Sequence, residues 1–217
     1  MKKILAFAAV AALSVAGVAP ADAAVITSLY NTGVTNSGTA TTGNGADLHW
    51  TLADGPAYTG GTNGVYPIGP WVSDTSTVRW ITPTQDASDN NAVAPFTYST
   101  TFSLAGFDFT TASLSGQFAA DDYVSSILLN STVLATNVGG YSYLTSFSAG
   151  SSAFVAGTNT LSFVSVNSGG GPAGLQVQVS GMANAVPEPG AWALMIVGFG
   201  GIGAALRRRR GQVALTA

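Results

Sequence analysis

The 217-residue sequence contains no cysteine and very little positive charge outside its two ends. Between residues 24 and 185 there are eight aspartates, one arginine, no lysine and no glutamate, which gives a formal net charge of −7. The absence of cysteine excludes disulfide scaffolds, thiol chemistry and zinc sites with cysteine ligands. A segment with a single cation cannot neutralise the phosphates of a nucleic acid, so nucleic acids are excluded as partners.

The N-terminus has the layout of a secretory signal peptide. A short basic region at residues 1–3 precedes an uncharged run, 4–18, that is rich in Ala, Val and Leu. Ala21 and Ala23 then supply the small residues that a signal peptidase reads. We therefore predict that residues 1–23 are a signal peptide, cleaved after Ala23, and that the rest of the chain is exported.

A second apolar segment lies near the C-terminus. Residues 191–206 are sixteen uncharged residues, and four arginines close the run. A helix of this length spans about 24 Å, against about 30 Å for the hydrocarbon core of a bilayer. We predict a transmembrane helix here, with the arginines and the tail 211–217 in the cytoplasm and residues 24–185 outside.

A specific motif surrounds this segment. A Pro-Glu-Pro triplet is followed by Trp-Ala, an apolar run and an arginine cluster, and residues 186–210 thus resemble the PEPxxWA subtype of the PEP-CTERM sorting signal. The resemblance implies recognition by an exosortase, a membrane protease-transferase of Gram-negative bacteria that produce exopolysaccharide. It also implies transient contact with the inner membrane and delivery to the cell surface or extracellular matrix. The residues that carry it are Pro187, Glu188, Pro189, Trp192, Ala193, Arg207, Arg208, Arg209 and Arg210.

Residues 24–185 form one domain in our interpretation, referred to below as the body. β-branched and aromatic residues alternate with Ser and Thr, most clearly over 96–104 and 175–180, which favours strands with one buried face. Many short strands separated by Gly- and Asn-rich turns predict an all-β fold, an antiparallel β-sandwich or jelly roll. Further strands are expected at 25–30, 48–53, 77–82, 114–119, 123–130, 132–136 and 160–167, and long loops at 55–70 and 84–95.

The second half of the body has a weaker family resemblance. The segments 118–123, 127–130 and 156–163 are similar to the core of galactose-binding-like jelly-roll domains, over about residues 114–181. Domains of that family bind carbohydrate or have purely structural roles, so the resemblance implies the fold more than a ligand.

Asp121 and Asp122 are candidate metal ligands. Neighbouring residues on a strand point to opposite faces, so the two are not the facing carboxylate pair that a glycosidase uses. A turn before the strand that starts at Tyr123, with the carboxylates capping backbone amides, is one interpretation. A calcium site is the other, because calcium prefers carboxylate and carbonyl oxygens. No other cofactor is expected.

Four further residues could take part in binding or catalysis. His49 and Asp47 share a strand face, but no nucleophile motif accompanies them, so we predict no catalytic residues. Trp71 follows Gly-Pro in an expected loop and is the best candidate for an exposed sugar-binding surface, with core packing as the alternative. Arg79 is expected to pair with an aspartate.

The sequence therefore indicates an exported, exosortase-sorted protein with a non-catalytic body. That body is either structural or binds carbohydrate in association with exopolysaccharide. The alternative is a secreted hydrolase that acts on glycans or esters.

Overall fold

The computed structural model describes residues 22–60, 67–85, 93–186 and 189–213. Most of the predicted signal peptide, including Ala21, lies outside the described residues, as do Pro187 and Glu188 of the sorting motif.

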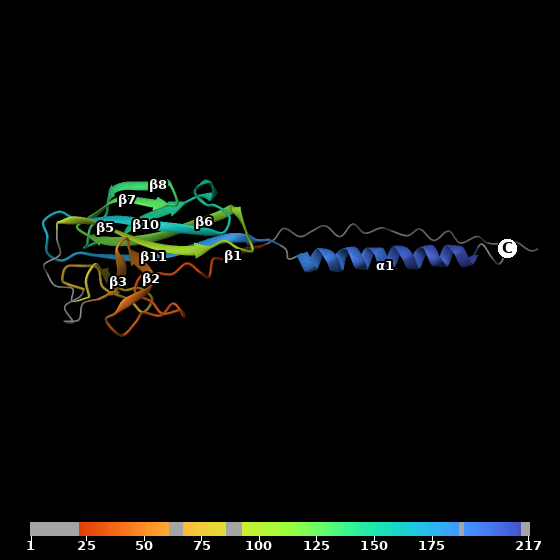
Figure 1. Ribbon diagram of the computed structural model, residues 1–217, viewed down its shortest axis with the longest axis horizontal. Helices are drawn as coiled ribbons and strands as arrows, with labels where there is room; N and C mark the ends of the chain where they lie inside the picture. The colour runs from red at the N-terminus through yellow and green to blue at the C-terminus, as the bar shows by residue number, and fades with distance from the viewer. Residues whose placement is uncertain (1–21, 61–66, 86–92, 187–188, 214–217) are drawn as a thin grey trace, which may run out of the picture.

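The described strands form one antiparallel sheet that nearly closes on itself, which confirms the predicted all-β class. The order is β8-β7-β10-β5-β2-β3-β4-β11-β6-β9, with β1 added to β11. The two ends of this order, β8 and β9, lie in contact. The strands are β1 (Ala23–Val25), β2 (Ala46–Leu52), β3 (Gly55–Thr59), β4 (Ile81–Thr82), β5 (Ala94–Ser103), β6 (Phe107–Asp121), β7 (Tyr123–Leu129), β8 (Thr132–Val138), β9 (Thr145–Ala149), β10 (Thr158–Asn167) and β11 (Gly174–Ala185) (Figure 1).

The core lies between two layers of this sheet and is centred on Phe163 of β10. Its ring lies 5.4 Å from that of Phe118 in β6 and 5.2 Å from that of Phe147 in β9. Neither strand neighbours β10 in the sheet, so these contacts cross from one layer to the other. Trp50 of β2 closes the cluster at 5.9 Å. Alternation of apolar and polar residues along each strand places these rings on one face.

Four expectations for strands and loops need correction. The strand expected at 77–82 consists only of β4, because the residues before it form an isolated bridge between Thr75 and Val78. The strand expected at 25–30 ends at Val25, because Ile26 and Leu29 turn into the core at a spacing of three residues. The loop expected at 55–70 contains β3, whose first residues, Gly and Pro, resemble a turn in the sequence. Strand β9 was not predicted, because its sequence is short and rich in Ser and Thr.

The helix α1 (Pro189–Val213) follows the body and extends away from it (Figure 1). Among the described residues, no helix has an apolar stretch long enough to cross a membrane. The prediction of a membrane span at 191–206 is therefore not supported by the helix as described. The uncharged run has only sixteen residues, and four of these are glycines, which contribute little hydropathy.

Because Phe163 is fully buried and contacts three rings, truncating it should leave a large cavity. We expect Phe163→Ala to lower the free energy of unfolding by about 3–5 kcal/mol. Urea denaturation of the purified protein measures this. The exposed Thr101→Ala on β5 is the control and should cost less than about 1 kcal/mol. Equal effects of the two variants would contradict the placement of the core.

Candidate functional site

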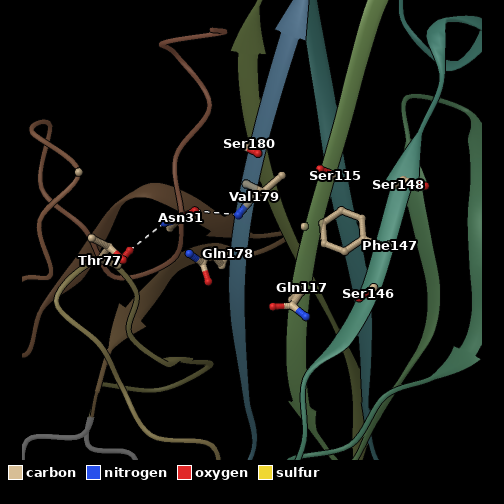
Figure 2. Close-up of a pocket in the computed structure, with 12 residues that line it drawn as sticks. Asn31, Thr77, Ser115, Gln117, Ser146, Phe147, Ser148, Gln178, Val179 and Ser180 are labelled. Carbon is tan, nitrogen blue, oxygen red and sulfur yellow. Dashed lines mark hydrogen bonds between the residues drawn. The ribbon is translucent and has the colours of Figure 1, made fainter.

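An open groove of about 840 Å³ crosses the outer face of β11, β6 and β9 (Figure 2). Its lining residues include no charged side chain, although the body as a whole is acidic. The lining consists of Asn31, Gly38, Thr77, Ser115, Gly116, Gln117, Ser146, Phe147, Ser148, Gln178, Val179 and Ser180.

The floor of the groove is built from two rows of polar side chains that cross the three strands. In one row, Gln117 of β6 lies between Gln178 of β11 and Ser146 of β9. The second row has the same arrangement and lies two residues away from the first on each strand. Because side chains alternate between faces, both rows point away from the core. The second row consists of Ser180, Ser115 and Ser148.

The six floor side chains have unused hydrogen-bonding capacity. Within the described part of the chain, none of them hydrogen-bonds to another residue, and all six line the groove (Figure 2). Each amide or hydroxyl group can therefore exchange a water molecule for a polar group of a ligand. A ligand that covers them gains these hydrogen bonds without disrupting any within the protein.

One wall of the groove comes from two loops that the structure fixes to the floor. The side-chain amide of Asn31 donates to the backbone oxygen of Thr77 at 2.8 Å and accepts from the amide of Val179 at 2.7 Å (Figure 2). This residue thus joins the two loops to β11.

Arg79 holds the same loops together. Its Nη1 donates to the backbone oxygens of Thr41 and Gly43 at 2.8 and 3.0 Å, and its Nε pairs with Asp74 at 3.4 Å. The predicted pairing with an aspartate is confirmed. Gly33 is required where the loop passes this side chain, because it has φ of 69° and a Cβ there would lie 2.4 Å from that of Arg79.

Trp71 is a buried residue that closes one end of the groove. It is only 8% exposed and packs on Trp80 with a ring separation of 4.2 Å. Together the two indoles cover Ala119, which continues the outward face of β6. The expectation of an exposed Trp71 is therefore wrong, and packing, the alternative, is what the structure shows. The loop folds onto the sheet because Asp74 accepts hydrogen bonds from the Trp80 amide and the Gln176 side chain.

The pair of Asp121 and Asp122 lies beside this end, which we call the distal end of the body. Their carboxyl groups are hydrogen-bonded to each other, and the Trp71 side chain donates to Asp121. The structure thus brings together the three residues proposed for binding from the sequence. The expectation that the two carboxyl groups point to opposite faces is wrong, because β6 ends at Asp121 and the chain turns there.

The two carboxyl groups have opposite protonation behaviour. Burial, followed by the hydrogen bond and charge of Asp122, raises the pKa of Asp121 to about 7. Burial also works to raise the pKa of Asp122, but hydrogen bonds from the Ser168 hydroxyl and amide outweigh it and hold that pKa below its usual value. The pair therefore shares one proton below neutral pH. Asp122 accepts backbone amides as predicted, although these belong to the loop before β11.

The calcium hypothesis stays a prediction. Within the residues that the structure describes, no group of three or more His, Asp or Glu side chains could hold a metal ion. Asp121 and Asp122 would have to give up their shared proton to bind a cation.

His49 and Asp47 do not form a catalytic arrangement with each other. The carboxylate of Asp47 accepts the backbone amides of Gly33, His49 and Trp50 at 2.7–2.8 Å, so it joins β2 to the loop at Gly33 rather than orienting the imidazole. Burial raises the pKa of this carboxyl group, and the same backbone hydrogen bonds oppose the shift. The imidazole stacks on Tyr30, with ring centroids 3.7 Å apart.

Comparison with known proteins identifies the C-terminal segment. A family model described as the PEP-CTERM protein-sorting motif matches residues 185–210. This match confirms the predicted sorting signal and supports an exported protein that an exosortase processes and delivers to the surface or the extracellular space. No curated protein and no solved structure matches the chain, so the resemblance to galactose-binding-like domains gains no support.

The raised pKa of Asp121 predicts that the stability of the protein depends on pH. Between pH 3.8 and about 7 the folded protein holds a proton that the unfolded chain has released. This contribution to stability is complete below pH 3.8 and is lost as the pH rises through about 7. The free energy of unfolding of the wild type, relative to Asp121→Asn, should therefore fall over this range, by up to about 1.4 kcal/mol per pH unit.

Urea denaturation of both proteins at pH 4 to 8 measures this difference. The exposed Asp54→Asn serves as the matched control and should follow the wild type. Parallel profiles for the wild type and Asp121→Asn would show that the pair does not share a proton.

Proposed function

We propose that the body is a non-catalytic module that binds a neutral polysaccharide in the groove over β11, β6 and β9. The observation that carries the proposal is the uncharged floor, where six hydroxyl and amide side chains lack partners among the described residues. Sugar hydroxyl groups are both donors and acceptors, which is the pattern that Ser and Gln side chains complement. An open groove suits a segment of a long chain better than it suits a small enclosed ligand.

Charge favours a neutral polymer over an acidic one. The body has a formal net charge of −7, and its one arginine is occupied by Asp74 and by backbone oxygens. An anionic polysaccharide would meet repulsion without a compensating cation. The lining also lacks carboxylates and histidine, which supports binding rather than hydrolysis in this groove.

The position of the sorting motif fits this role. The match starts at residue 185, where β11 ends, and the amide of Val186 still donates to Gly106 at 2.8 Å. Strand β1 pairs with the same end of β11, with Ala23 opposite Asn184. Ala23, where signal-peptide cleavage is predicted, and Val186, which precedes the Pro-Glu-Pro triplet of the sorting motif, therefore lie at one end of the body, opposite the distal end. Attachment there would leave the groove and the distal end open to the exopolysaccharide of a Gram-negative producer.

The groove proposal predicts a specific loss of binding. In Gln117→Ala/Gln178→Ala, two exposed amides are removed without touching the core. Because a hydrogen bond contributes about 1 kcal/mol, affinity for the producer's own exopolysaccharide should fall about tenfold or more. Affinity electrophoresis of the processed protein measures this, with Thr101→Ala on β5 as the control of unchanged affinity.

Two outcomes would contradict the proposal. Unchanged binding in the double variant would place the polysaccharide elsewhere. Turnover of a glycan or ester that is lost in His49→Ala or Asp122→Ala would establish the alternative, a secreted hydrolase.

The sorting signal has a separate test. We expect Pro187→Ala/Pro189→Ala to retain the C-terminal segment and to lose surface display, because the exosortase motif is removed. The mass of the surface-released protein reports both processing sites. Normal release of a shortened form would contradict the role of this motif.

A further inference from the structure

The outward face of β11 changes from polar to apolar near the C-terminal end of the strand. Gln178 and Ser180 belong to the groove floor, whereas Met182 is apolar and 44% exposed. Because side chains alternate along a strand, these three residues point to the same side of the sheet. The apolar part therefore begins where the strand approaches the sorting motif.

Strand β1 enlarges this apolar part, at the end of the body from which α1 extends (Figure 1). Val25 is 58% exposed and lies directly opposite Met182 in the antiparallel pair. Opposite residues share a face, with Cβ atoms about 4.5–5.5 Å apart, so the two side chains form one apolar surface. We call Val25 and Met182 the proximal patch.

The core fixes the position of this patch. Ile26 is buried, and its amide donates to the oxygen of Gly181 at 2.9 Å. A Cβ on Gly181 would lie 2.9 Å from Cδ1 of Ile26, so the isoleucine packs directly against β11. With Ile26 held in the core, the alternation of side chains directs Val25 outward. The proximal patch is therefore a surface that exists only on the folded body, because its two residues come from opposite ends of the body.

The surroundings of the patch do not supply a charge that would oppose an apolar partner. Residues 183–185, which follow Met182, are uncharged. Asp108 lies opposite Asn184, but its carboxylate accepts the amide and the hydroxyl group of Thr110 at 3.0 and 2.6 Å. Adjacent exposed apolar side chains on an otherwise polar surface mark a site of interaction with a partner.

The partner follows from the position of the sorting motif. The amide of Val186 donates to Gly106 at 2.8 Å, so the folded body reaches to the residue before the Pro-Glu-Pro triplet. A strand advances about 3.3 Å per residue, so the five steps from Met182 to Pro187 cover at most about 17 Å. An enzyme bound to the triplet therefore lies within reach of the proximal patch, and the patch continues the surface that the motif presents to it.

We propose that Val25 and Met182 form a docking surface for the exosortase, used while that enzyme holds the sorting motif. The inference does not depend on polysaccharide binding. An apolar contact beside the motif adds affinity for the substrate without taking part in the reaction. Because the two residues meet only after β1 has paired with β11, the contact also favours the processing of bodies that have already folded.

The test follows removal of the C-terminal segment from the full chain in the producing cells, by pulse labelling and the masses of precursor and product. Val25→Ser/Met182→Ser should be processed about five- to tenfold more slowly than the wild type, because the burial of two apolar side chains is lost. Met182→Ser alone, far along the chain from the predicted signal-peptide site, should be slowed by a smaller factor. The control is Val133→Ser on β8, where a valine of similar exposure, 55%, is removed and the wild-type rate is expected.

Cross-linking identifies the partner directly. A photo-crosslinking side chain in place of Met182 in the full chain should give an adduct with the exosortase, identified by mass spectrometry. The same side chain in place of Val133 should give no such adduct.

Several outcomes would overturn this assignment. Wild-type processing of the double variant removes the docking surface, and equal slowing of Val133→Ser makes the effect unspecific. Slow processing together with a lower melting temperature makes the two residues structural. Adducts with lipid alone assign the patch to the membrane surface, and adducts with a second copy alone assign it to self-association. None of these results bears on the groove, which the glutamine double variant tests separately.

Discussion

The pairing of β6 with β11 is the constraint on which the rest of the molecule depends. Over most of its length, from Gly174 opposite Asp121 to Met182 opposite Ser113, successive side chains alternate between two environments. The inward set completes the core around Phe163, and the outward set forms the groove floor. A shift of one residue in register would exchange the two sets and destroy both. Core and candidate site are therefore two consequences of one hydrogen-bonded ladder.

The loops around this ladder decide how much of its outer face stays open. Arg79 and Asn31 fix one wall, and Trp71 covers the face at the distal end. The buried Gln176 shows this effect directly. It shares a strand face with the exposed Gln178, but its side chain donates to Asp74 beneath the loop that carries Trp71. Two glutamines with the same strand orientation thus differ in role because one is covered. The isolated Asp74–Arg79 ion pair, partly exposed, contributes modestly compared with the backbone hydrogen bonds of the same arginine.

The sequence predicted local features well and long-range neighbours poorly. The sorting motif could be identified completely because its residues lie within one short segment. The alternation at 175–180 identified a strand with one solvent-exposed face. Nothing local indicated that Gln178 would lie opposite Gln117, about sixty residues earlier. The Gly-Pro neighbours of Trp71 indicate a loop and hence exposure, but composition does not distinguish a loop that folds back onto a sheet. The sequence could not predict the shared proton of Asp121, because the burial of this carboxyl group and its contact with Asp122 arise only in the folded chain.

The proposed polysaccharide site lies across the outward face of β6 and β11. The most direct test is the NMR signals of the side-chain amides of the processed, isotopically labelled protein during titration with exopolysaccharide fragments. If the polysaccharide lies there, the signals of Gln117 and Gln178 shift together and saturate, while that of the covered Gln176 stays in place. Absence of shifts at Gln117 and Gln178 while signals elsewhere on the body respond would contradict it.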